Sequence, residues 1–252
     1  MRTFTPTLLA LTIGSFTLQA ENAPDKAPAW DVNAPQGQFE TVDINVSQGS
    51  WMNIAVSPDG KTIAFDLLGD IYTMPITGGK ATQLTKDIGW QMQPAFSPNG
   101  KHIAYTSDEG GGDNIWIMNA DGSDARPVTK ETFRLLNSPA WSPDGEFIVA
   151  RKHFTASRSL GAGEVWMYHK TGGNGIMLTA RQNDQKDLGE PAFSPDGKYV
   201  YFSHDDTPGK TFHYSKDSES GIYTIKRFER ESGNIEVVLS GAGGAIRPTP
   251  SP

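Results

Sequence analysis

The residue types that perform catalysis in hydrolases and metalloenzymes are present in this sequence, but they are not spaced as such sites require. The five histidines form neither a His-x-His pair nor a His-Glu-x-x-His motif, which would place two imidazoles on one metal ion. No Gly-x-Ser-x-Gly motif exposes a nucleophilic serine, and cysteine is absent. The sequence therefore predicts no catalytic residue, no metal ligand and no cofactor site within this chain.

Binding is the chemistry that the polar residues could still perform. Three polar segments, 107–113, 151–163 and 203–220, connect apolar stretches that have the pattern of strands. Long polar loops on a rigid scaffold are common positions for ligand contacts. The alternative, that these loops are solvated insertions, stays open. The candidates for contact with a ligand or a partner domain are Asp108, Arg151, His153, Arg158, His204, Asp205 and His213.

A four-residue turn motif recurs along the chain and defines the elements that must position these residues. It reads Ser-Pro-Asp-Gly or Ser-Pro-Asn-Gly, and its copies begin at Ser57, Ser97, Ser142 and Ser194, which are 40, 45 and 52 residues apart. Proline presets φ at the second position, Asp or Asn tolerates the third, and glycine adopts the left-handed conformation that closes the bend. An apolar segment precedes each copy and an alternating segment follows it, so each copy predicts a hairpin.

Two further strands complete each unit. A third apolar segment begins near Asp70, Asn114, Glu164 and Gly221, and a second tight turn then leads to a fourth segment. From the Ser of each motif to the first apolar residue of the third strand the spacing grows through 14, 18, 23 and 28 residues. Four antiparallel strands in each unit of roughly 40 to 50 residues is typical of a propeller blade. We therefore predict an all-β fold, a β-propeller of four-stranded antiparallel blades.

The predicted ring is incomplete in this chain. We expect blades at about 51–90, 91–135, 136–185 and 186–241, and the start of another at 242–252. The last residues, Ile246 to Pro252, repeat the strand before the turn and the first half of a fifth turn motif. Because a domain has no physical reason to finish in the middle of a hairpin, we expect a fragment of about four blades plus a stub.

The first residues and the charge balance indicate a compartment and exclude some partners. Arg2, the apolar run from Leu8 to Leu18 and the small residue Ala20 predict a signal peptide at 1–20, followed by an extended lead-in at 21–50 with a possible strand around Phe39–Val46. We expect a periplasmic or secreted protein without a membrane span after signal removal. The formal net charge of −7 argues against nucleic acid as a partner.

The repeats resemble the TolB-like propeller blade from about Trp51 to the end of the chain. The segment from Trp51 to Tyr72, together with Trp30-Asp31-Val32-Asn33, is more specific. It is similar to the start of large exported bacterial proteins in which such a propeller precedes a metal-dependent amidohydrolase barrel. The resemblance implies a non-catalytic propeller that docks against a downstream hydrolase domain of the same polypeptide, where a divalent metal such as zinc is expected.

Two other classes of protein share this blade and stay open at this point. A stand-alone TolB-like protein would use the propeller to bind a periplasmic protein or peptide. A prolyl-oligopeptidase-type enzyme would use it as a gate over a serine peptidase domain. Sequence beyond residue 252 would distinguish them, because each class places a different motif there.

Overall fold

The computed structural model describes residues 31–132, 135–155, 161–209 and 222–251. The predicted signal peptide at 1–20 and the first part of the lead-in lie outside these residues. In the described part of the chain, no helix is long and apolar enough to cross a membrane.

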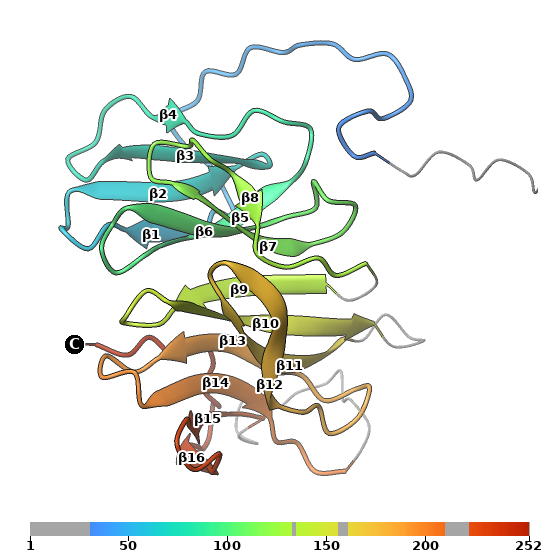
Figure 1. The fold of residues 1–252 in the computed structure, drawn as a ribbon, viewed down its shortest axis with the longest axis vertical. Coiled ribbons are helices and arrows are strands. Elements are labelled where there is room, and N and C mark those ends of the chain that lie inside the picture. The colour runs from blue at the N-terminus through green and yellow to red at the C-terminus, as the bar shows by residue number, and fades with distance from the viewer. Residues whose placement is uncertain (1–30, 133–134, 156–160, 210–221, 252) are drawn as a thin grey trace, which may run out of the picture. The chain divides into compact units, whose positions relative to one another are not determined.

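Sixteen strands within the described residues form four antiparallel sheets of four strands each (Figure 1). Blade 1 contains β1 (Ile54–Val56), β2 (Thr62–Leu67), β3 (Asp70–Pro75) and β4 (Thr82–Gln83). Blade 2 contains β5 (Gln91–Phe96), β6 (His102–Ser107), β7 (Asn114–Asn119) and β8 (Arg126–Pro127). Blade 3 contains β9 (Leu135–Trp141), β10 (Phe147–Thr155), β11 (Gly161–His169) and β12 (Gly172–Thr179). Blade 4 contains β13 (Leu188–Phe193), β14 (Tyr199–Asp205), β15 (Tyr223–Glu229) and β16 (Ile235–Leu239). The prediction of an all-β propeller fold with four-stranded antiparallel blades is confirmed.

Each predicted turn motif joins the first and second strands of its blade through the same set of hydrogen bonds. In blade 3 the Ser142 hydroxyl donates to Asp144 Oδ1 at 2.5 Å and accepts from the Phe147 N–H at 2.9 Å. The closing glycines have φ between 67° and 72°. A Cβ placed on Gly145 would lie 3.7 Å from Pro98 Cδ. The turns of neighbouring blades therefore lie side by side on one face.

Apolar clusters between neighbouring sheets hold the blades together. One cluster joins Ala64 and Ile71 of blade 1 to Tyr105 and Met118 of blade 2. A second lies between blades 2 and 3, and a third between blades 3 and 4. The first strands β1, β5, β9 and β13 contact one another in that order, so they share a common centre.

Two local predictions were wrong. The lead-in forms no strand at 39–46, and Val42, Ile44 and Val46 are more than half exposed there, because no strand edge pairs with their alternating pattern. In addition, the described parts of the predicted loop 151–163, which are residues 151–155 and 161–163, are strand, because β10 and β11 continue their pairing to Thr155 and Gly161.

Candidate functional site

The centre that the first strands share is built from a repeated bulge that places polar side chains there. Gln93, Ser138, Glu190 and Arg247 each precede a proline and have φ between 52° and 57°. The ladder register shifts at this point in blades 2, 3 and 4. A non-glycine residue in the left-handed region is uncommon and persists only where its surroundings hold it.

Hydrogen bonds from neighbouring blades hold these bulges. The Gln93 N–H donates to Asp66 Oδ2 of blade 1 at 2.7 Å, and the Ser138 N–H donates to Gln93 Oε1 of blade 2 at 2.7 Å. The Arg247 N–H donates to Ser203 Oγ of blade 4 at 2.9 Å. Three of the four bulges are therefore stabilised by the blade before them, which links the blades through polar contacts as well as apolar ones.

Two adjoining cavities occupy this centre, and we call them together the central channel. One has a volume of about 420 Å³ and is lined by Asn53, the four bulge residues and their prolines. The other, of about 370 Å³, shares Gln93, Ser138 and Glu190 and is also lined by Arg151 and Asp187. The combined lining offers amide, hydroxyl, carboxylate and guanidinium groups, and each of the four blades contributes at least one polar side chain.

Ion pairs compensate the charges that line the channel. Arg247 Nε lies 2.8 Å from Glu190 Oε1, and Arg151 Nη2 lies 2.6 Å from Asp187 Oδ1. The side chain of Arg247 is 76% exposed, so this pair is screened by water and remains accessible to a ligand. These paired charges can exchange their contacts for those of a polar ligand.

A second polar cluster lies where blades 3 and 4 meet, at the ends of β10 and β14. Lys186 and Asp205 are almost completely buried, with Lys186 Nζ 3.5 Å from Asp205 Oδ1. His204 Nδ1 lies 2.7 Å from Asp206 Oδ1, which also accepts from Lys226 Nζ at 2.8 Å. We call these five residues the junction cluster.

Two members of the junction cluster, His204 and Asp206, have shifted pKa values, and so does His153 on β10. Burial, followed by the charge of Lys226, lowers the pKa of His204. Burial, followed by the charge of Arg151, lowers the pKa of His153, whose buried Nδ1 has no hydrogen-bond partner among the described residues. Burial alone would raise the pKa of Asp206, but hydrogen bonds from Lys226 and Thr224 outweigh it and lower the pKa overall.

The structure brings four of the seven predicted contact residues to the part of the molecule that holds the central channel and the junction cluster. Arg151 and His153 lie on β10, while His204 and Asp205 end β14, so all four are in strands rather than in the predicted loops. Asp108 is elsewhere, where its carboxylate accepts from the Trp90 N–H at 2.7 Å between blades 1 and 2. Arg158 and His213 lie outside the described residues.

Sequence reasoning missed the bulge residues of the central channel, although a signal exists. Each stands in an Xaa-Pro pair four residues before a turn-motif Ser-Pro pair, at Gln93-Pro94, Ser138-Pro139, Glu190-Pro191 and Arg247-Pro248.

Within the described residues, no group of three or more His, Asp or Glu side chains is arranged to hold a metal ion.

Comparison with known proteins gives the family. The model of the TolB beta propeller domain matches residues 37–211. The chain is 28% identical over 187 residues to the uncharacterized peptidase YuxL of Bacillus subtilis, a match that covers 58% of this chain and 28% of YuxL. It is 25% identical over 162 residues to a putative Tricorn-like protease C-terminal subunit of Sulfurisphaera tokodaii, covering 64% of this chain and 18% of that protein.

A solved structure agrees with this fold. TolB from Acinetobacter baumannii is similar with a TM-score of 0.56 at 22% identity, over 79% of this chain and 45% of that one. The chain spans less than a third of the length of the two curated relatives named above. The family model matches most of the described residues, and the observed blades follow its architecture. The chain belongs to the TolB beta propeller family.

Proposed function

We propose that this chain is the non-catalytic propeller of an exported hydrolase, and that its central channel receives extended polypeptide segments before they reach a peptidase domain. The observation that carries the proposal is the lining of the channel. Gln93, Ser138 and Glu190 offer amide, hydroxyl and carboxylate groups at one centre. A peptide backbone presents alternating N–H donors and C=O acceptors that such groups can satisfy.

The relatives favour a peptidase as the partner domain. Two of them carry the words peptidase or protease in their names and are several times longer than the region they share with this chain. A propeller beside a peptidase domain can select substrates by admitting extended chains and excluding folded ones. The amidohydrolase expectation rests on the resemblance of Trp30–Asn33 and of the segment from Trp51 to Tyr72, and no relative named above supports it.

Export remains part of the proposal. The features of residues 1–20 that predict a signal peptide belong to the sequence, and the absence of cysteine is compatible with an oxidising compartment. Cell fractionation of the full chain, with and without residues 1–20, measures this directly. Retention of the intact chain in the cytoplasm would contradict export.

Binding and turnover are tested on the purified 252-residue chain. The probe is reduced and carboxymethylated α-lactalbumin, an unfolded polypeptide, with the folded protein as its matched control. We expect saturable binding of the unfolded probe, no cleavage, and binding that is about tenfold weaker for Glu190→Gln or Arg247→Ala, since each removes a charge-assisted contact. Lys198→Ala, on an exposed turn, is the control variant.

Two outcomes would contradict the proposal. If the chain cleaves the probe, with or without added zinc, the propeller is not merely a gate. If folded and unfolded probes bind equally, or neither binds, the channel does not receive extended polypeptide.

A further inference from the structure

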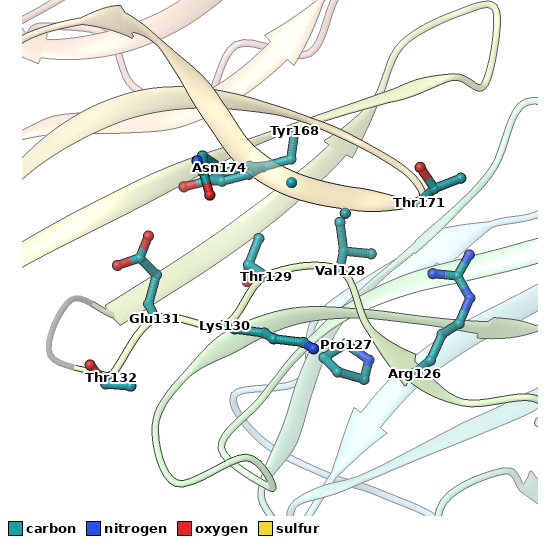
Figure 2. Close-up of a pocket in the computed structure, with 12 residues that line it drawn as sticks. Arg126, Pro127, Val128, Thr129, Lys130, Glu131, Thr132, Tyr168, Thr171 and Asn174 are labelled. Atoms are coloured by element: carbon teal, nitrogen blue, oxygen red, sulfur yellow. The ribbon is translucent and has the colours of Figure 1, made fainter.

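A groove with a volume of about 720 Å³ lies between blades 2 and 3, away from the central channel. Figure 2 shows its two walls, the segment Arg126–Thr132 on one side and the hairpin turn between β11 and β12 on the other. It shares no lining residue with either cavity of the central channel. Whatever binds here therefore does not depend on the function proposed for the channel.

The groove contains a buried hydroxyl that has no partner. Tyr168 on β11 is 2% exposed, and its hydroxyl makes no hydrogen bond with any residue that the structure describes. A buried polar group without a partner costs free energy, and native structures rarely leave one without a water or a ligand to satisfy it. The register of the sheets shows that this position is apolar in the other blades, where Met74, Met118 and Phe228 occupy it.

The ring of Tyr168 is held firmly, so its hydroxyl occupies a fixed place at the groove. The ring belongs to the apolar cluster between blades 2 and 3 and stacks on Trp166, with ring centroids 6.3 Å apart and planes at 19°. A Cβ placed on Gly175 would lie 2.4 Å from the ring, so the backbone of β12 can approach it only because this residue is glycine. The apolar packing fixes the ring without using its hydroxyl.

Two cations on the opposite wall indicate the kind of ligand. Arg126 Nη1 donates to the Lys170 carbonyl at 3.2 Å, which fixes the guanidinium across the groove, and Lys130 is exposed beside it. In the described part of the chain neither cation has an ion-pair partner. The acidic residue of the groove, Glu131, is already paired with Lys152 at 2.6 Å. The groove therefore offers a ligand two cations and the Tyr168 hydroxyl, beside the polar side chains of Thr132 and Asn174.

We propose that this groove binds a carboxylate-bearing ligand. Its carboxylate contacts Arg126 and Lys130, and a neighbouring carbonyl or hydroxyl oxygen accepts a hydrogen bond from the Tyr168 hydroxyl. A guanidinium is well matched to a carboxylate, because two parallel N–H donors can face its two oxygens. The same chemistry is offered by the C-terminal end of a short peptide and by a free organic acid, and the experiment separates these sources.

The experiment is calorimetric titration of the full chain with three probes, which are trialanine, trialanine amide and succinate. Binding of trialanine that is lost with the amide identifies a peptide C-terminus as the source, and binding of succinate alone identifies a free acid. In either case we expect Arg126→Gln to weaken binding about tenfold and Tyr168→Phe to weaken it about fivefold, in line with one charged and one neutral hydrogen bond. Tyr105→Phe, which removes a buried hydroxyl between blades 1 and 2, should leave binding unchanged.

Thermal unfolding of Tyr168→Phe separates a ligand contact from a structural role. Because the hydroxyl lacks a protein partner, its removal should leave the melting temperature equal or higher. The proposal is overturned if neither trialanine nor succinate binds up to ~10 mM, where weak ligands still give measurable heat. It is also overturned if Tyr168→Phe binds as the unmodified chain does, or if this variant melts several degrees lower.

Discussion

Gly163→Ala tests the packing between blades 3 and 4 most sharply. A Cβ on Gly163 would lie 1.9 Å from the Leu188 carbonyl oxygen and 2.8 Å from Arg151 Nε. Leu188 belongs to β13, which is paired with β14, so its carbonyl cannot move unless the two blades separate. The clash costs about 1–3 kcal/mol as overpacking. Displacing Arg151 from Asp187 costs roughly 1.5–3 kcal/mol more.

The expected total loss of unfolding free energy is roughly 2.5–6 kcal/mol, and the assay is urea unfolding followed by circular dichroism. For a domain of this size that corresponds to a fall of about 10 °C in melting temperature. Gly112→Ala is the matched control, because its Cβ would meet only the Glu131 carbonyl at 3.9 Å. We expect that control to change stability by less than about 1 kcal/mol. Equal stabilities of the two variants would refute the packing described between blades 3 and 4.

Three further predictions concern the turns, the titration and the contacts between blades. Ser142→Ala should lower the unfolding free energy by about 2 kcal/mol, because it removes two hydrogen bonds of a buried hydroxyl. Ser57→Ala should lower it by about half as much, because the equivalent hydroxyl of blade 1 is more exposed. Similar losses for the two variants in urea melts would contradict the role of burial. Stability should decline as pH falls below about 6.5, the pKa of an unfolded histidine, because the folded-state pKa of His204 is lowered and the unfolded chain then binds more protons. Melting temperatures between pH 7.5 and 5.5 should fall less steeply in His204→Asn, and an unchanged slope would contradict this. Trp141→Phe should lower the unfolding free energy by about 1 kcal/mol or more, because the indole N–H donates to the Ala95 carbonyl of blade 2 at 3.0 Å. An unchanged unfolding free energy in urea melts would show that this bond contributes nothing.

The repeated parts of the fold could be predicted from the sequence because their causes are local. The turn motif specifies its own conformation through proline, Asp or Asn, and glycine, and alternating apolar residues specify the flanking strands. The lead-in shows the limit of such reasoning. Val42, Ile44 and Val46 alternate as a strand would, yet a strand forms only where another edge can pair with it.

The candidate site could be predicted only in part, because tertiary contacts override local rules there. The residue before a proline is normally extended, but Gln93 and Glu190 are left-handed. For Gln93 the cause is a hydrogen bond from its N–H to Asp66 of another blade. Arg151 and His153 were placed in a loop because they are polar, whereas the long hairpin of blade 3 keeps them in register.

The central claim is that extended polypeptide enters the central channel, and one chemical protection measurement tests it most directly. Since the chain has no cysteine, Ser138→Cys places a single thiol at the wall that both cavities share. Its rate of alkylation by a maleimide should fall severalfold when the unfolded probe saturates the chain, while the thiol of Ser232→Cys on an exposed turn should react at an unchanged rate. Equal alkylation of the Ser138→Cys thiol with and without saturating probe would contradict the account.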